Sequence, residues 1–497
     1  MNGLFAQNSN GILSLDARST KQDFQNATNH IEEFDDLRLS LAIDTKELYE
    51  QLVTLIESRN NSHKFSDTTP SASSSSSSSR LWNHIGLFSC TGPYVANLIQ
   101  RILQLDCTRQ FKFGTYHPER QPLDIVALAK GLATAHSLRV LDVGLGKMTI
   151  EGIFLLADAL GHCVHLTELN LGILQIAEGN SNNTRNHHDM TKPESTSEIL
   201  LSARHLAKAI VHDSHIDKII MICYGDEIQS PLQSAVLEEL QHHPSMLHEL
   251  RFALFPPWAI YKTIPLLQHN KLQGLDVACV RFMEPGGRHH GDDNNSTDGN
   301  HGHHQDDEDV PSVISIAHAL ETNTSLQFLD LSVNSINDTE LMTITDCLRR
   351  NKSCPLEELN LSYNKLTDEG LRYFVSAMVN MKHLKRFHWK GNSTGEDGCR
   401  CLMEALKTNT MLEEVDIESR LTYQQEILWL TRCNQGGRRL LVKQDVPRSW
   451  WPLVLARING LEFLGSSSCE PGEDHKTVRV QVLYYFLRNG PVLLEQG

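Results

Sequence analysis

Residues 326–348 read LQFLDLSVNSINDTELMTITDCL, and residues 356–378 repeat the pattern as LEELNLSYNKLTDEGLRYFVSAM. In each copy leucine occupies the first, fourth and sixth places, and an asparagine follows three places later. The spacing of two between Leu329 and Leu331 puts both side chains on one face of a strand. Apolar residues then recur every three or four places, which is the period of a helix. The pattern predicts a strand, a turn and a helix, written twice in succession.

One such unit cannot bury its own apolar face, so neighbouring units have to stack. The two copies resemble leucine-rich repeats of the kind found in ribonuclease inhibitor and in the sensor ends of NOD-like receptors. The resemblance implies a curved α/β solenoid with parallel strands on the concave side, helices on the convex side and a helical C-terminal cap. It also implies a non-enzymatic interaction scaffold that binds a protein partner on its concave sheet and needs no cofactor.

The apolar residue of the fourth place recurs through most of the chain. Ile85, Phe113, Leu141 and Leu169 lie 28 residues apart at each step. The series continues at Ile219, Leu250, Leu275, Leu329, Leu359, Phe387 and Val415. Helices are predicted between these strands, at Ile125–Leu132, Ile153–Leu160, Leu200–Ile210, Leu232–Leu240, Val313–Leu320, Leu341–Leu348 and Gly398–Leu406.

Polar and Ser-rich stretches divide the chain further. Two overlong steps in the series contain polar blocks near 179–196 and 284–309, and both are predicted to be disordered loop inserts. The full prediction is a flexible arm at 1–34, a degenerate first repeat or N-terminal cap at 35–59, a Ser-rich disordered insert at 60–80, a solenoid at 81–420 and a C-terminal cap at 421–497.

Composition excludes several classes of protein. The 497 residues are 40% apolar, which is enough for one continuous core, and carry a formal charge of −16, which opposes binding to nucleic acid or anionic membranes. The sequence has neither a secretory signal nor an apolar run long enough to span a membrane. Eleven scattered cysteines without a Cys-x-x-Cys pair favour a reducing compartment. These features predict a cytoplasmic monomer whose partner is a protein.

The third, fifth and seventh places of each repeat point away from the core, so they are the candidate binding residues. In the last four repeats most of these residues are polar. The third of these repeats has basic residues at these places, and the repeats on either side of it have acidic ones. The predicted binding residues are Phe328, Asp330, Ser332; Glu358, Asn360, Ser362; Arg386, His388, Lys390; and Glu414, Asp416, Glu418. They are interpreted either as a protein docking face or as a solvated sheet whose opposite charges neutralise one another.

Three further motifs have simpler interpretations than chemistry. Asn334, Asn364 and Asn392 are expected to bond to backbone groups of the turns. The block 288–309 holds five histidines among many carboxylates, but nothing fixes their geometry, so no specific metal site is predicted. The basic residues between Arg432 and Arg457 are expected to cover the apolar helices of the cap, with binding to an acidic partner or a membrane as the alternative.

Catalytic motifs are absent from the sequence. It has no Gly-x-x-x-x-Gly-Lys-Ser/Thr loop, no His-Glu-x-x-His and no Gly-x-Ser-x-Gly. Resemblance to the Ran GTPase-activating protein is confined to the repeats, because a folded and locally basic segment stands where that family usually has an acidic run. A regulatory protein of this fold, such as a GTPase-activating protein or a ubiquitin-ligase substrate adaptor, remains the alternative to a passive scaffold.

Overall fold

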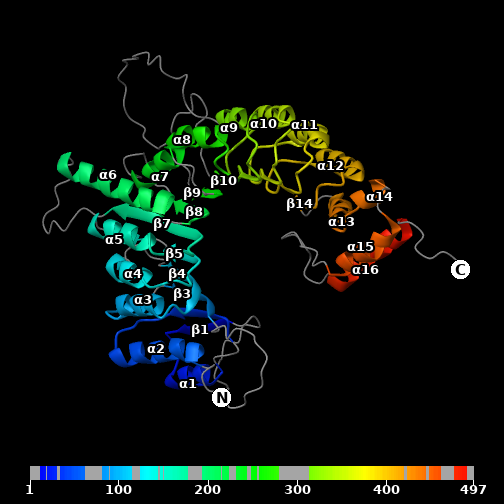
Figure 1. Ribbon diagram of the computed structural model, residues 1–497. Coiled ribbons are helices and arrows are strands. Elements are labelled where there is room, and N and C mark those ends of the chain that lie inside the picture. Colours follow the sequence, from blue (N-terminus) through cyan, green and yellow to red (C-terminus); the bar gives the residue numbers. More distant parts are fainter. Residues whose placement is uncertain are drawn as a thin grey trace, which may run out of the picture. The chain divides into compact units, whose positions relative to one another are not determined.

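The computed structural model divides the chain into two compact units, unit 1 over residues 1–253 and unit 2 over residues 254–497 (Figure 1). Placement is described for residues 12–17, 19–30, 34–61, 81–88, 90–114, 124–143, 146–148, 150–176, 193–213, 215–222, 231–242, 248–253, 257–278, 313–418, 422–443, 447–460 and 475–489. Of the predicted disordered inserts, 62–80, 179–192 and 284–309 lie outside these residues. Residues 60–61 and 193–196 belong to the helices Lys46–Asn61 and Pro193–Lys208, so the predicted insert bounds are wrong there. None of the described helices combines the length and the apolar character needed to cross a membrane.

Unit 1 alternates strands and helices along a parallel sheet. The strands are β1 (Ile12–Asp16), β2 (Asp36–Ser40), β3 (Trp82–Phe88), β4 (Thr108–Gly114), β5 (Val140–Val143), β6 (Gly146–Met148), β7 (Glu168–Ile176), β8 (Lys218–Ile222) and β9 (Glu249–Ala253). The helices are α1 (Lys21–Asn29), α2 (Lys46–Asn61), α3 (Val95–Gln104), α4 (Ile125–Leu132), α5 (Ile150–Leu160), α6 (Pro193–Lys208), continued by a π-helical turn, and α7 (Pro231–His242). Consecutive strands from β1 to β9 pair in parallel, except that β5 and β6 both pair with β7.

Unit 2 continues the alternation with shorter strands. The strands are β10 (Gly274–Asp276), β11 (Phe328–Asp330), β12 (Glu358–Asn360), β13 (Arg386–His388) and β14 (Glu414–Asp416), each paired in parallel with the next. The helices are α8 (Pro257–Gln268), α9 (Val313–Leu320), α10 (Asp338–Arg350), α11 (Asp368–Ala377), α12 (Glu396–Thr408), α13 (Gln424–Gln435), α14 (Arg439–Lys443), α15 (Trp451–Gly460) and α16 (His475–Asn489). Helices α9 to α12 follow one another along one side of the sheet (Figure 1).

The core of the repeats lies between the strand layer and the helix layer. Leucines of the first, fourth and sixth places are buried in both quoted repeats, as their spacing predicts. Phe387 and Trp389 replace two of them in the next repeat, and their rings pack 5.5 Å apart with the Phe387 ring stacked on Phe374 of α11. A fully buried Leu or Phe side chain stabilises the fold by about 1.5–3 kcal/mol. The α/β solenoid architecture predicted from the repeats is confirmed.

Asparagines of the ninth place join each repeat to its neighbour. The amide nitrogen of Asn364 donates to the carbonyls of Leu331 (3.0 Å) and Leu361 (2.9 Å). Its side-chain oxygen accepts from the backbone nitrogens of Asn334 (2.9 Å) and Ile336 (3.0 Å). Asn392 repeats the arrangement one step later. The structural interpretation of this series is confirmed, because these side chains satisfy backbone groups that the short strands leave unpaired.

The N-terminal prediction and one step of the register are wrong. Residues 12–30 contain β1 and α1, and β1 pairs with β2, so they are not a flexible arm. Helix α1 has few apolar residues and is held by a capping box between Thr20 and Asp23. The residue that pairs with both Ile85 and Leu141 is Phe111, and not Phe113. The predicted register is shifted by two residues at this strand. Because side chains alternate along a strand, Phe111 and Phe113 lie on the same face, so the equal spacing of 28 residues concealed the shift.

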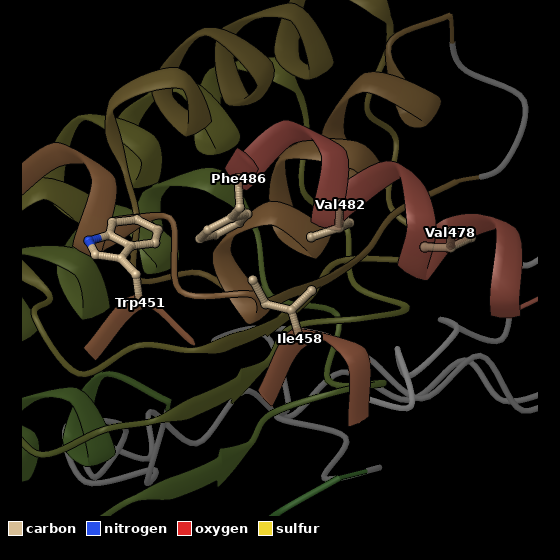
Figure 2. Close-up of a cluster of buried hydrophobic side chains, with 5 residues drawn as sticks. All are labelled: Trp451, Ile458, Val478, Val482 and Phe486. Carbon is tan, nitrogen blue, oxygen red and sulfur yellow. The ribbon is translucent and has the colours of Figure 1, made fainter. Parts of the chain in front are cut away.

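In the described residues, helices α13 to α16 and a short 3-10 helix (Arg448–Trp450) follow β14, where a C-terminal cap is predicted. Trp451 and Ile458 of α15 meet Val478, Val482 and Phe486 of α16 in a buried cluster (Figure 2). Helix α13 packs against α12 and β14.

The predicted basic stretch of this region begins with two buried arginines, Arg432 and Arg438. Burial lowers the pKa of Arg438, whose guanidinium donates to the carbonyls of Leu406 and Asn409 (2.7 Å to Asn409). Arg438 therefore has a structural role, but it binds backbone carbonyls at the end of α12 from a buried position and does not cover the cap helices as predicted.

Candidate functional site

The strand face of unit 2, meaning the outward side chains of β11 to β14, is the predicted binding surface. The strand register sets these side chains in two rows that cross the sheet. One row is Phe328, Glu358, Arg386 and Glu414, and the other is Asp330, Asn360, His388 and Asp416. All eight are half-buried, which places them on the side of the sheet opposite the leucine core, as the spacing predicts.

The other four predicted binding residues lie just beyond the strands: Lys390 and Glu418 are half-buried, whereas two serines do not lie on this surface. Ser332 is 8% exposed and Ser362 is 6% exposed, so both are buried. The cause is the turn that follows each short strand, because the next residue adopts a left-handed backbone. Val333 has φ 59° and Tyr363 has φ 57°, and both side chains are exposed. The turn thus covers the serine of the seventh place and presents the residue of the eighth place.

Glu358 joins two basic side chains of the neighbouring strand. Its carboxylate lies 2.5 Å from Nε of Arg386 and 3.3 Å from Nε2 of His388. The hydrogen bond with His388, aided by Arg386, holds the pKa of Glu358 below its ordinary value despite burial. Burial acts to lower the pKa of His388, but the hydrogen bond with Glu358 and the surrounding carboxylates outweigh it and raise that pKa. The positive charge of Arg386 and His388 on β13 is therefore largely neutralised by Glu358 of β12.

Asp330 and Asn360 are occupied within the sheet. The amide nitrogen of Asn360 donates to Asp330 Oδ2 at 2.8 Å. The remaining oxygen of each side chain accepts from the backbone nitrogen two residues later, at Ser332 (2.8 Å) and Ser362 (3.0 Å). These bonds stabilise the turn and occupy the polar atoms of both side chains, although no opposite charge faces Asp330 among the described residues.

The two carboxylates of β14 and that of Glu418, two residues beyond the strand, are different. Glu414, Asp416 and Glu418 form no ion pair with any residue that the structure describes, although Glu414 pairs in register with Arg386. The Oδ1 atom of Asp416 is buried and accepts no hydrogen bond from the described residues. A buried carboxylate oxygen without a donor is costly, and a donor supplied by a bound molecule removes that cost.

The exposure of the apolar side chain at the eighth place of these repeats was not predicted from the sequence. Tyr363 is 56% exposed, and a Cβ atom at Gly391 would lie only 2.4 Å from the Tyr363 ring. The Tyr363 ring thus rests against a glycine that itself has φ +74°. Aromatic side chains with this exposure are common anchors in protein interfaces. The sequence feature that could have indicated this surface is the residue just before each repeat asparagine, which is Val333, Tyr363 or Gly391.

Unit 1 has a hollow on its own strand face, which the sequence did not indicate. It measures about 710 Å³ and is lined mainly by polar side chains of β2 to β5 and β7, together with Phe88, Phe111 and Val140. Lys112 pairs with Asp142 at 2.6 Å across its floor. His84 lines the same hollow. Its pKa is lowered, mainly by burial and further by the charges of Arg38 and Lys112. The carboxylates of Asp36 and Asp142 act in the opposite direction but do not outweigh these causes. The predicted set had confined binding to the last four repeats.

Comparison with known proteins agrees with the repeat architecture. Residues 352–375 match the leucine-rich repeat family. Human NACHT, LRR and PYD domains-containing protein 14 is 33% identical over 94 residues, which are 19% of this chain and 8% of that protein. The human protein 5 of the same name is 30% identical over 94 residues, again 19% of this chain and 8% of that protein. The similarity thus covers less than a tenth of each relative.

Solved structures of low sequence identity also align with the chain. An internalin (inlF) from Listeria monocytogenes aligns with 82% of this chain and 87% of its own, at 12% identity and a TM-score of 0.34. Actin-binding site 2 of leiomodin-1 aligns with 37% of this chain and 94% of its own, at 17% identity and a TM-score of 0.29.

Proposed function

Because the chain is a leucine-rich repeat protein, whose fold suggests a protein-interaction scaffold, we propose that the strand face of unit 2 binds a protein partner without catalysis. The observation that carries this proposal is the unequal pairing of charge across that face. Arg386 and His388 are held by Glu358, whereas the three carboxylates at the β14 end have no ion-pair partner among the described residues.

The partner's contact chemistry follows from this imbalance. Arginine or lysine side chains of a partner would meet Glu414 and Glu418 on either side of Asp416. The exposed Tyr363 ring, two strands away, offers an apolar anchor beside these charges. We therefore propose a partner segment that is basic where it crosses β14 and apolar where it reaches Tyr363.

A pair of charge-reversal variants tests the proposal. Glu414→Lys with Glu418→Lys changes the strand face, and Asp397→Lys with Glu404→Lys makes the same change of net charge on the exposed side of α12. Partners are recovered by cross-linking from native lysate, and circular dichroism confirms that both variants fold. We expect the strand-face variant to lose a partner that the α12 variant keeps, and the cross-linked peptides of that partner to be basic.

Two outcomes would count against the proposal. If both variants recover the same partners as the unchanged chain, the carboxylates of β14 are only a solvated surface. If the α12 variant alone loses the partner, binding takes place on the helix layer.

A further inference from the structure

Three metal-ligating side chains meet on the helix layer of unit 2, away from the strand face. His318 lies on α9, Glu321 follows one turn later just beyond the end of that helix, and Cys347 lies on α10. One ligand atom from each residue lies within 4.8 Å of the other two, and Nδ1 of His318 is 3.9 Å from Sγ of Cys347. The cluster thus brings together nitrogen, oxygen and sulfur donors from two neighbouring repeats.

The donor set favours a borderline-soft divalent ion. Zinc binds thiolate sulfur at ~2.3 Å and imidazole nitrogen at ~2.0 Å in tetrahedral geometry, which places the two donor atoms about 3.5 Å apart. The observed separation of 3.9 Å between Nδ1 and Sγ needs only a small side-chain adjustment to reach it. Magnesium and calcium prefer all-oxygen sites, so the sulfur and nitrogen donors disfavour them.

The guanidinium group of Arg350 already contacts two of these three side chains. Arg350 places Nε 2.8 Å from one oxygen of Glu321 and Nη2 3.3 Å from the other, and Nη2 also lies 3.2 Å from Sγ of Cys347. This contact shows that the sulfur is within reach of a polar group, although Cys347 as a residue is buried. Arg350 itself is about half exposed, so its side chain has room to leave.

We propose that His318, Glu321 and Cys347 form a binding site for Zn²⁺, with a fourth position open to water and with Arg350 as the group that the ion displaces. Binding removes the thiol proton of Cys347 to solvent, because the thiolate is the ligand. The ion would join α9 to α10 and so strengthen the contact between two adjacent repeats, on which solenoid stability depends.

Cobalt is the probe for this site, because thiolate coordination to Co²⁺ gives a near-ultraviolet charge-transfer band that oxygen and nitrogen ligands do not produce. The experiment uses the full chain with His289, His290, His301, His303 and His304 replaced by Asn, so that the His-rich block does not compete. We expect the band on addition of Co²⁺ and its loss on addition of Zn²⁺, which binds such ligands more tightly. A competing chromophoric chelator then gives the Zn²⁺ affinity.

Matched variants separate this site from incidental binding. Cys347→Ser should abolish the band, and His318→Ala should weaken Zn²⁺ binding by at least about tenfold, whereas Cys354→Ser should change neither. Arg350→Gln should strengthen binding by about two- to fivefold, because an exposed ion pair no longer competes. Absence of the band in the unchanged site, or its persistence in Cys347→Ser, overturns the proposal. Because His318 is exposed, its variant gives an answer even if Cys347→Ser does not fold.

Discussion

Units 1 and 2 stack the same kind of repeat but hold neighbouring repeats together by different means. In unit 2, strands β11 to β14 are three residues long, and the buried Asn334 and Asn364 and the half-buried Asn392 bridge the turns that follow β11 to β13. In unit 1, β3 and β4 are seven residues long with six residue pairs in register, and β7 is nine residues long. At β3 and β4 longer strand pairing thus takes the place of the side-chain bridges, whereas β5 and β7 pair over only three residues.

Two cysteines of unit 1 stand at positions that asparagine takes in unit 2. Cys90 lies five residues after Ile85, as Asn364 lies five after Leu359, and its thiol donates to the carbonyl of Leu39 at 3.3 Å. Cys163 contacts the carbonyl of Leu132 at the end of α4, as Asn351 does with Leu320 at the end of α9. Burial raises the pKa of both thiols to about 11, so they remain protonated donors at neutral pH. The comparison shows that one weak thiol donor suffices where the strands are long.

The largest expected effect is that of Asn364→Ala. The substitution leaves the backbone nitrogens of Asn334 and Ile336 and the carbonyl of Leu331 without the bonds that Asn364 provides. We expect the free energy of unfolding to fall by about 3–5 kcal/mol, since each buried backbone group without a partner costs about 1–3 kcal/mol. Urea unfolding followed by circular dichroism measures it. The exposed Asn380→Ala is the control and should stay within about 0.5 kcal/mol of the unchanged chain.

Gly391→Ala tests the left-handed turn of unit 2. With φ +74°, an alanine at this position costs about 1–2 kcal/mol, and its methyl group also displaces the Tyr363 ring. Adding Tyr363→Ala should recover the part of the loss that comes from the ring. The control is Gly460→Ala in α15, where nothing lies within 4 Å of the new methyl group. A loss at Gly460 as large as that at Gly391 would refute the explanation by backbone conformation.

Cys90→Ala sharpens the comparison between the units. It removes a single thiol donor to the Leu39 carbonyl, while the β2–β3 and β3–β4 pairing remains. We expect a loss of about 1 kcal/mol in the free energy of unfolding, by the same urea titration. A loss equal to that of Asn364→Ala would mean that the thiol matters as much as the amide and that longer strands do not compensate.

The sequence predicted the last four repeats of unit 2, from Leu326 onward, well because their leucines keep their spacing without long insertions, so the period alone sets strand, turn and helix. It also placed Glu358, Arg386 and His388 outward correctly, since alternation along a strand needs no further information. It could not predict the burial of Ser332 and Ser362, which depends on the left-handed residue after each. Nor could it show that Glu358 neutralises Arg386, because that contact depends on the register between strands.

Unit 1 was harder to predict for two physical reasons. Phe111 and Phe113 lie on the same strand face, so either of them fits an apolar position, and only pairing with Ile85 distinguishes them. Helix α1 is stabilised by its capping box more than by an apolar stripe, which a search for periodic apolar residues does not detect. The hollow of unit 1 arises from side chains of several strands, and their relation appears only in the folded sheet.

The smallest expected effect concerns the histidine on each strand face. Burial, as the main cause, lowers the pKa of His84 from 6.5, and carboxylates led by Glu358 raise the pKa of His388 from the same value against its burial. A lowered histidine pKa destabilises the fold as pH falls through about 6.5, because the unfolded state then binds more protons. A raised pKa gives stability that is complete below about 6.5 and is lost as pH rises through the folded-state value.

The two histidines should therefore respond to pH in opposite directions. Relative to the unchanged chain, the His84→Gln variant should become more stable as pH falls from 7.5 to 5.5. The His388→Gln variant should become less stable over the same change. Each change should be no more than about 1 kcal/mol, since both side chains are partly exposed. Urea midpoints of the two variants across this range measure the difference. Parallel curves for both variants would show that the two strand faces have the same electrostatic character, because only the opposite environments of His84 and His388 can make the curves diverge.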